Sequence, residues 1–277
     1  MEQFTNDGFT FEVTDSGSSS DDVIVVLHGF PESRESWREV TPHLVKAGYR
    51  VLAPNQRGYS RGARPKERRA YTLDKLARDI IALADAAGAE RFHVVGHDWG
   101  GGVAWELAAN HGPRVATMTS LATPHPKALT KAMRTSSQGL KSWYMGMFQL
   151  PALPELGFTR LPGRMRKQLV GSGLREDYVD EYLKLLAEPG AARGALNWYR
   201  AAPLSVRAPM GDVLVPAMYV YGTGDFALGR KAADMTAEFV TGPYRYEILE
   251  GVSHWIPEEV PQVVAELVLD HIKSSKP

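Results

Sequence analysis

The chain has 277 residues with 32 basic and 32 acidic side chains, so its formal net charge is zero, and it contains no cysteine. A neutral chain offers no global field to attract nucleic acid or an anionic membrane, and the lack of cysteine excludes disulfides, thiol nucleophiles and cysteine-ligated metals. The N-terminal residues lack a secretory pattern and no apolar stretch approaches the roughly 20 residues of a membrane span. We therefore expect a soluble, cytoplasmic protein with no nucleic-acid or membrane partner.

Residues 1–126 alternate between strand and helix patterns. An apolar–polar alternation around Asn6-Asp7-Gly8 predicts an N-terminal β-hairpin. The β-branched run over residues 23–27 is typical of a strand buried on both faces of a parallel sheet. Further strands are predicted over residues 49–53, 92–95 and 115–121, and helices over residues 36–46, 72–87 and 103–110. This alternation predicts right-handed βαβ units and a mainly parallel, doubly wound sheet.

The pattern changes after Pro126. The following stretch has no buried-strand run, is rich in Met, Leu, Tyr, Trp and Arg, and predicts short helices, two of them over residues 177–187 and 191–199. Strands are predicted again over residues 215–221 and 244–249, and helices over residues 230–239 and 257–273. We therefore predict an α/β core of residues 1–126 and 209–277, whose sheet has about eight strands, and an inserted helical cap of residues 127–208.

A glycine-rich segment, Gly96-His97-Asp98-Trp99-Gly100, stands between a predicted strand and a predicted helix. Glycines two positions before and two after one reactive side chain are the spacing of a nucleophile elbow, a tight strand-to-helix turn. Such a turn has strained backbone angles and tolerates little side-chain volume beside its apex. The apex here is Asp98, which makes a carboxylate the predicted nucleophile. The alternative is a glycine-rich turn in which the aspartate only caps a helix.

Two later strand ends supply partners for such a nucleophile. Asp225 follows the strand at residues 215–221, and His254 follows the strand at residues 244–249. In open parallel sheets, sites lie beyond the carboxyl ends of the strands. Taken singly, Asp225 could stabilise a glycine-rich turn and His254 could be an ordinary loop histidine. Together with Asp98 they follow the chain order nucleophile, acid, base that is typical of the α/β-hydrolase fold.

The segment His28-Gly29-Phe30-Pro31 ends the first buried strand. In this fold a backbone N–H after that glycine, with the N–H of the residue after the nucleophile, forms an oxyanion hole. The sequence therefore predicts an oxyanion hole from the peptide groups of Phe30 and Trp99. The alternative is a plain Gly-Pro turn at a strand end.

Three segments carry a family resemblance: His28-Gly29-Phe30-Pro31-Glu32-Ser33, Arg57-Gly58-Tyr59-Ser60 and Gly96-His97-Asp98-Trp99-Gly100-Gly101. With the contexts of Asp225 and His254, they closely resemble the epoxide hydrolases of the α/β-hydrolase superfamily, and the resemblance runs along nearly the whole chain. It implies a small-molecule epoxide substrate and no cofactor, and no histidine or carboxylate spacing indicates a metal site. Asn55 departs from the aspartate that the resemblance leads us to expect before Gln-Arg-Gly-Tyr.

The resemblance also assigns residues in the helical cap. Members of the family use two cap tyrosines to hold the epoxide oxygen, and the matching motifs place these roles on Tyr144 and Tyr199. The residues expected to contact substrate are Phe30, Trp99, Trp143, Tyr144, Trp198 and Tyr199. As an alternative, the cap aromatics could form only the core of the cap.

An aspartate nucleophile suits attack on a saturated carbon, because attack on an ester carbonyl would form a reactive anhydride. We expect Asp98 to form an alkyl-enzyme ester. Water that is activated by His254, which Asp225 orients, then hydrolyses this ester. A haloalkane dehalogenase with the same triad is the nearest alternative, with Trp99 and Trp143 as halide donors. A non-catalytic ligand-binding relative is a third interpretation, and a homodimer is left open.

Overall fold

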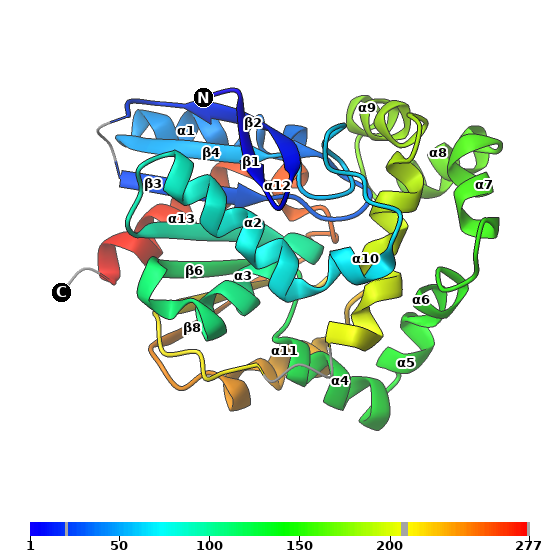
Figure 1. Cartoon of the computed structure of the whole chain (residues 1–277). Coiled ribbons are helices and arrows are strands. Elements are labelled where there is room, and N and C mark those ends of the chain that lie inside the picture. The colour runs from blue at the N-terminus through cyan, green and yellow to red at the C-terminus, as the bar shows by residue number, and fades with distance from the viewer. Residues whose placement is uncertain (20–21, 206–209, 276–277) are drawn as a thin grey trace.

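The structure, a computed structural model, describes residues 1–19, 22–205 and 210–275. Within these residues, one eight-stranded sheet has the order β1-β2-β4-β3-β5-β6-β7-β8 (Figure 1). The strands are β1 (Gln3–Asn6), β2 (Phe9–Ser16), β3 (Asp22–Leu27), β4 (Tyr49–Pro54), β5 (Phe92–His97), β6 (Val115–Leu121), β7 (Ala217–Gly222) and β8 (Tyr244–Leu249). The predicted α/β class and the predicted number of strands are confirmed.

Six neighbouring strands, from β4 across to β8, are parallel, whereas β2 pairs in the antiparallel sense with both β1 and β4. Strand β3 lies between β4 and β5, so the winding of the chain changes direction beside it. Leu27 of β3 is in register with Gly96 of β5. The loops that leave these two strands therefore start side by side, at the kind of position where open α/β sheets bind ligands.

Helices cover both faces of the sheet (Figure 1). One core layer packs α2 (Leu73–Ala86) and α3 (Trp99–Asn110) against side chains such as Val25, and the other packs α1 (Thr41–Lys46) and α13 (Pro261–Ser274) against side chains such as Val26. Successive residues of β3 thus alternate between two apolar layers, which explains why its sequence is an unbroken apolar run.

Seven described helices lie between β6 and β7 along the chain. They are α4 (Pro126–Thr135), α5 (Gln138–Lys141), α6 (Trp143–Met147), α7 (Leu153–Thr159), α8 (Pro162–Gly171), α9 (Glu176–Leu186) and α10 (Ala191–Ser205). In Figure 1 they gather beyond the right-hand end of the sheet, where the strands β3 and β5 end. The predicted cap boundary at residues 208–209 falls outside the described residues, so the division into core and cap stays a prediction.

Three helices that the sequence predicts as continuous are each divided in two. The pairs are η1 (Arg34–Trp37) with α1, α11 (Arg230–Asp234) with η4 (Thr236–Phe239), and α12 (Ile256–Glu259) with α13. Pro42 and Pro261 stand in the first turns of α1 and α13, where a residue without an N–H starts a helix but cannot continue the preceding one. Short 3-10 turns η2 (Arg68–Tyr71) and η3 (Gly112–Arg114) complete the described elements. Each described helix is too short or too polar to cross a bilayer.

Candidate active site

Asp98 stands at the apex of the turn between β5 and α3, with backbone angles φ 48° and ψ −119°. A side chain at Gly96 would meet the backbone oxygen of Gly100 at 2.1 Å, and one at Gly100 would meet the backbone oxygen of Leu27 at 2.3 Å. The glycines are thus required for close backbone packing, as the elbow interpretation predicts. The positive φ of Asp98 is a conformation that residues with a Cβ rarely adopt.

The structure brings the three predicted residues together at the carboxyl ends of β5, β7 and β8. His254 Nδ1 lies 2.7 Å from Asp225 Oδ2, and His254 Nε2 lies 3.6 Å from Asp98 Oδ2. The other oxygen of Asp225 accepts hydrogen bonds from the peptide N–H groups of Ala227 and Leu228, at 2.7 and 2.9 Å. The Asp225 carboxylate is therefore held in place and in turn orients the imidazole.

Burial and neighbouring charges shift the pKa values of His254 and Asp98 in opposite directions. Burial alone would lower the pKa of His254, but the Asp225 carboxylate and then the Asp98 carboxylate outweigh it and raise that pKa well above its usual value. Burial would likewise raise the pKa of Asp98, but the hydrogen bond and charge of His254 lower it. Asp98 is therefore ionised at neutral pH, which is the state in which a carboxylate acts as a nucleophile.

The peptide N–H of Phe30 donates a hydrogen bond to Asp98 Oδ1 at 2.9 Å. Trp99 is the first residue of α3, so its peptide N–H belongs to the helix N-terminus, where such groups have no intrahelical partner. The two predicted oxyanion-hole donors thus come from backbone next to the Asp98 carboxylate. The Phe30 ring instead packs against Phe148, at 5.5 Å between ring centroids, and lies outside the cavity lining.

A cavity of about 340 Å³ opens beside Asp98, between the core and the inserted helices. Asp98, Trp99, Tyr144 and Tyr199 line it, together with apolar residues such as Met145. The rings of Tyr144 and Tyr199 lie 6.1 Å apart. The two tyrosines that the resemblance implied therefore share one cavity with the predicted nucleophile.

The tyrosine hydroxyls remain protonated in this cavity. Burial, followed by the Asp98 charge, raises the pKa of Tyr144 and raises that of Tyr199 well above the usual value. A phenol with a raised pKa keeps its proton at neutral pH and can donate a hydrogen bond. Both side chains can therefore stabilise negative charge that develops on a bound oxygen atom.

Three of the residues expected to contact substrate do not line the cavity, namely Phe30, Trp143 and Trp198. Trp143 is 66% exposed, and Trp198 is fully buried, with its indole N–H donating to the Arg57 carbonyl at 2.7 Å. Neither residue lines the cavity. The cavity thus gives no support to the prediction that they contact substrate: Trp143 is exposed on a short helix, and the Trp198 ring packs beside Trp99, at 6.0 Å between ring centroids.

Asn55, which departs from the family resemblance, has a local explanation. Its side-chain oxygen accepts a hydrogen bond from the peptide N–H of Arg34 at 3.0 Å, and its amide donates to Glu12 at 3.1 Å. An aspartate at this position would place a second carboxylate against Glu12, whereas the asparagine supplies a donor. The substitution therefore changes a loop contact and leaves the carboxylate–imidazole trio untouched.

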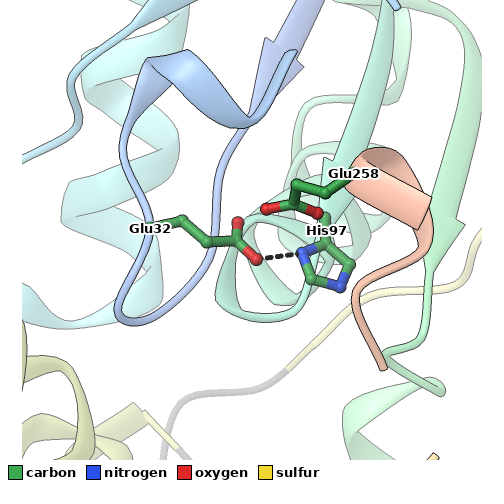
Figure 2. A group of neighbouring side chains, drawn as sticks. All are labelled: Glu32, His97 and Glu258. Carbon is green, nitrogen blue, oxygen red and sulfur yellow. Dashed lines mark ion pairs between the residues drawn. The ribbon is translucent and has the colours of Figure 1, made fainter. Parts of the chain in front are cut away.

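Glu32, His97 and Glu258 form a buried cluster that the sequence did not lead us to expect (Figure 2). His97 Nδ1 lies 2.6 Å from Glu32 Oε1, and His97 Nε2 lies 2.8 Å from the main-chain oxygen of His254. Tyr182 of α9 donates a hydrogen bond to Glu258 at 2.9 Å. One indication of this cluster is present in the sequence, because each of its members stands within four residues of Phe30, Asp98 or His254.

A shared proton explains this cluster better than a metal ion. Both ring nitrogens of His97 face acceptor oxygens, so a proton must lie in each contact. Tetrahedral ligands at zinc–nitrogen distances stand about 3.3 Å apart, farther than the 2.6 Å between His97 and Glu32. Burial, then the charge of Glu32, raises the pKa of Glu258 to about 8. The cluster therefore holds a protonated acid at neutral pH beside the backbone of His254.

Comparisons with known proteins agree with this geometry. Residues 22–261 match the family described as alpha/beta hydrolase fold. The chain is 35% identical to the AB hydrolase superfamily protein YfhM of Bacillus subtilis (strain 168), over 98% of each chain. It is 31% identical to Epoxide hydrolase A of Mycobacterium tuberculosis (strain ATCC 25618 / H37Rv), over 96% of this chain and 94% of that protein. The crystal structure of Epoxide Hydrolase A from Mycobacterium thermoresistibile is similar with a TM-score of 0.85 and 28% identity, over 98% of this chain and 97% of that one.

Proposed function

The chain belongs to the α/β hydrolase fold family, and we propose that it is an epoxide hydrolase that converts an epoxide to a vicinal diol. The observation that carries the proposal is the cavity that Asp98 shares with Tyr144 and Tyr199. A carboxylate and two phenol hydroxyls are complementary to the electrophilic carbon and the oxygen of an oxirane. The epoxide hydrolases among its relatives, such as that of Mycobacterium tuberculosis, support the same activity.

The first step forms an ester on Asp98. One carboxylate oxygen attacks an oxirane carbon, the carbon–oxygen bond of the ring breaks, and the electron pair moves to the epoxide oxygen. Hydrogen bonds from Tyr144 and Tyr199 stabilise that oxygen, and a tyrosine proton neutralises it. The raised pKa values of both phenols support this role, since the hydroxyls are protonated when substrate binds.

The second step hydrolyses the ester. His254 removes a proton from water, the water oxygen attacks the carbonyl carbon of the ester, and the Phe30 and Trp99 N–H groups stabilise the resulting oxyanion. Collapse breaks the bond to the substrate, and the leaving alkoxide takes the proton held by His254. The carboxylic acid left on Asp98 then loses its proton, which restores the tyrosine that protonated the epoxide oxygen. Esterification removes the Asp98 charge that helps to raise the pKa of His254. The pKa of His254 therefore falls, and more of the imidazole is neutral at the stage that needs a base.

A single turnover in ¹⁸O-labelled water tests this route. With enzyme in excess over an aryl epoxide, the first diol should carry unlabelled oxygen, because that oxygen comes from Asp98. Label should enter the enzyme carboxylate instead and reach diol only in later turnovers. Label in the diol of the first turnover would exclude the covalent route, and absence of any diol over a panel of aliphatic and aryl epoxides would exclude the function.

The cavity favours an epoxide over a haloalkane. A dehalogenase needs two donors for the departing halide, and in this chain Trp143 would have to assist Trp99. Trp143 is largely exposed and does not line the cavity, whereas two phenols do. Halide release from haloalkanes, measured beside diol formation, separates the two activities, and ligand retention without turnover would support a non-catalytic binding protein.

Replacing Tyr199 with phenylalanine should slow formation of the alkyl-enzyme roughly 100-fold, because one donor to the developing oxyanion is lost. Hydrolysis of the ester, which does not involve the epoxide oxygen, should change much less. Stopped-flow fluorescence in single turnovers resolves the two rates. Tyr178→Phe is the matched control, since Tyr178 is also a buried tyrosine of the inserted helices but lies outside the cavity. Equal slowing of both variants would contradict the role of Tyr199.

A further inference from the structure

One face of α3 forms a wall of the cavity. Asp98, Gly102 and Glu106 lie four residues apart along the chain, and all three line the cavity with Trp99. Residues at this spacing lie on the same side of a helix. With a rise of 1.5 Å per residue, the eight residues from Asp98 to Glu106 span about 12 Å. The cavity therefore continues along α3, well beyond the reacting carboxylate.

Glu106 places a second carboxyl group on this wall, and it is only 7% exposed. One of its oxygens accepts a hydrogen bond from the Asn110 amide at 2.7 Å. Among the described residues, no basic side chain forms an ion pair with Glu106. Lys127, the basic residue that lines the cavity, donates its ammonium to the Met210 carbonyl at 3.0 Å. A buried carboxyl group thus faces the cavity without a charged partner.

The Glu106 carboxyl group favours a hydrogen-bond donor and disfavours negative charge beside it. Burial, then the hydrogen bond from Asn110 and the charge of Asp74, set the pKa of Glu106, and the net shift is upward. Only one Glu106 oxygen accepts a hydrogen bond from the described residues, so the other can accept one from a ligand, while a carboxylate on that ligand would be repelled. The lining of the cavity is otherwise largely apolar, with Gly102, Leu129 and Met133 among its members.

We propose that Glu106 is a specificity-determining residue that binds the hydrogen-bond-donating end, ammonium or hydroxyl, of an elongated and otherwise apolar epoxide. The oxirane lies at Asp98 and the donor group lies on the order of 12 Å away, at Glu106. The inference rests on the proposed epoxide hydrolase function and names the substrate class of the same site. It also excludes epoxides of this length that end in a carboxylate.

The test uses four straight-chain terminal epoxides of equal length, with an ammonium, hydroxyl, methyl or carboxylate group at the far end. The unmodified enzyme should show the highest kcat/KM for the two donor-ended epoxides, roughly tenfold above the methyl-ended one, and the lowest for the carboxylate. The difference should lie mainly in KM, because the contact forms far from the reacting atoms. Equal kcat/KM for all four would overturn the inference.

Two substitutions at Glu106 separate charge from hydrogen bonding. Glu106→Gln keeps an acceptor but removes the charge, so it should lose most of the preference for ammonium and keep the preference for hydroxyl. Glu106→Leu should lose both, while turnover of the methyl-ended epoxide rises severalfold. Glu90→Leu, which removes an exposed glutamate outside the cavity, is the matched control. An unchanged preference in Glu106→Leu would overturn the inference.

A steric block at Gly102 tests the path between the two carboxyl groups. A Cβ at Gly102 meets only a Leu73 methyl group, at 3.7 Å, so the backbone accepts a side chain there. Gly102→Val should lower kcat/KM for the long donor-ended epoxides at least tenfold more than for a short epoxide. An equal effect on the long and the short epoxides would show that the donor end of the long epoxides does not reach Glu106 along this path, which would overturn the inference. Turnover of the short epoxide also distinguishes failure of this inference from failure of the proposed function, which would abolish turnover of every epoxide.

Discussion

Replacing Asp98 with glycine should abolish epoxide turnover, lowering kcat/KM by at least about 10⁴-fold, while the protein still folds. The carboxylate is the proposed nucleophile, and no other ionised side chain among the described cavity residues stands next to His254. Diol formation by chromatography measures the loss. Activity within tenfold of the unmodified enzyme would show that water attacks the epoxide directly and would remove Asp98 from its proposed role.

The backbone at Asp98 makes glycine more informative than alanine here. With φ at 48°, position 98 is strained for any residue that has a Cβ. Asp98→Ala keeps this strain and Asp98→Gly relieves it, so the glycine variant should be more stable than the alanine variant by about 1 kcal/mol. Chemical denaturation compares the two. If both are equally inactive and differ in stability in this direction, the loss of activity comes from the missing carboxylate and not from the fold.

Replacing His254 with glutamine should leave the first step intact and block the second. The variant should consume one equivalent of epoxide and then nearly stop, with steady-state turnover reduced roughly 10³- to 10⁴-fold. Without the imidazolium, the Phe30 peptide N–H still donates a hydrogen bond to the Asp98 carboxylate, and this bond favours the ionised form that attacks the epoxide. Intact-protein mass spectrometry should show the enzyme carrying the mass of one epoxide.

The double variant Asp98→Gly/His254→Gln is the control, and it should gain no mass under the same conditions. Addition of mass to the double variant would locate the alkylation on another residue. Failure of the single variant to gain mass would mean that His254 is needed before the ester forms, which would contradict its proposed role as the base of the hydrolytic step.

Acidic pH should produce the same intermediate in the unmodified enzyme. The pKa of Asp98 is lowered, so attack on the epoxide continues below neutral pH. Hydrolysis needs neutral His254, and its rate therefore falls as pH drops through the pKa of that imidazole in the alkyl-enzyme. This pKa lies below the raised value of the free enzyme, because the Asp98 charge is gone. Below it, the ester should accumulate.

The sequence by itself determined the sheet and the grouping of Asp98, Asp225 and His254. An unbroken apolar run such as residues 23–27 indicates a strand covered on both faces, and the glycines around Asp98 indicate a turn that only a backbone without Cβ atoms can make. Asp225 and His254 follow strands that are parallel neighbours, so the position of each in the chain also placed it in space. These features depend on local backbone geometry, which short segments encode.

Only the tertiary structure decided which side chains face the cavity. Trp143 and Tyr144 are adjacent in one short helix, yet the first is exposed and the second lines the cavity. Helical periodicity predicts that a helix has a buried face, but not whether that face meets protein or an open cavity. The same holds for Glu106, and for the meeting of Glu32, His97 and Glu258 from three segments. Such contacts depend on how distant elements pack, and no local pattern encodes that packing.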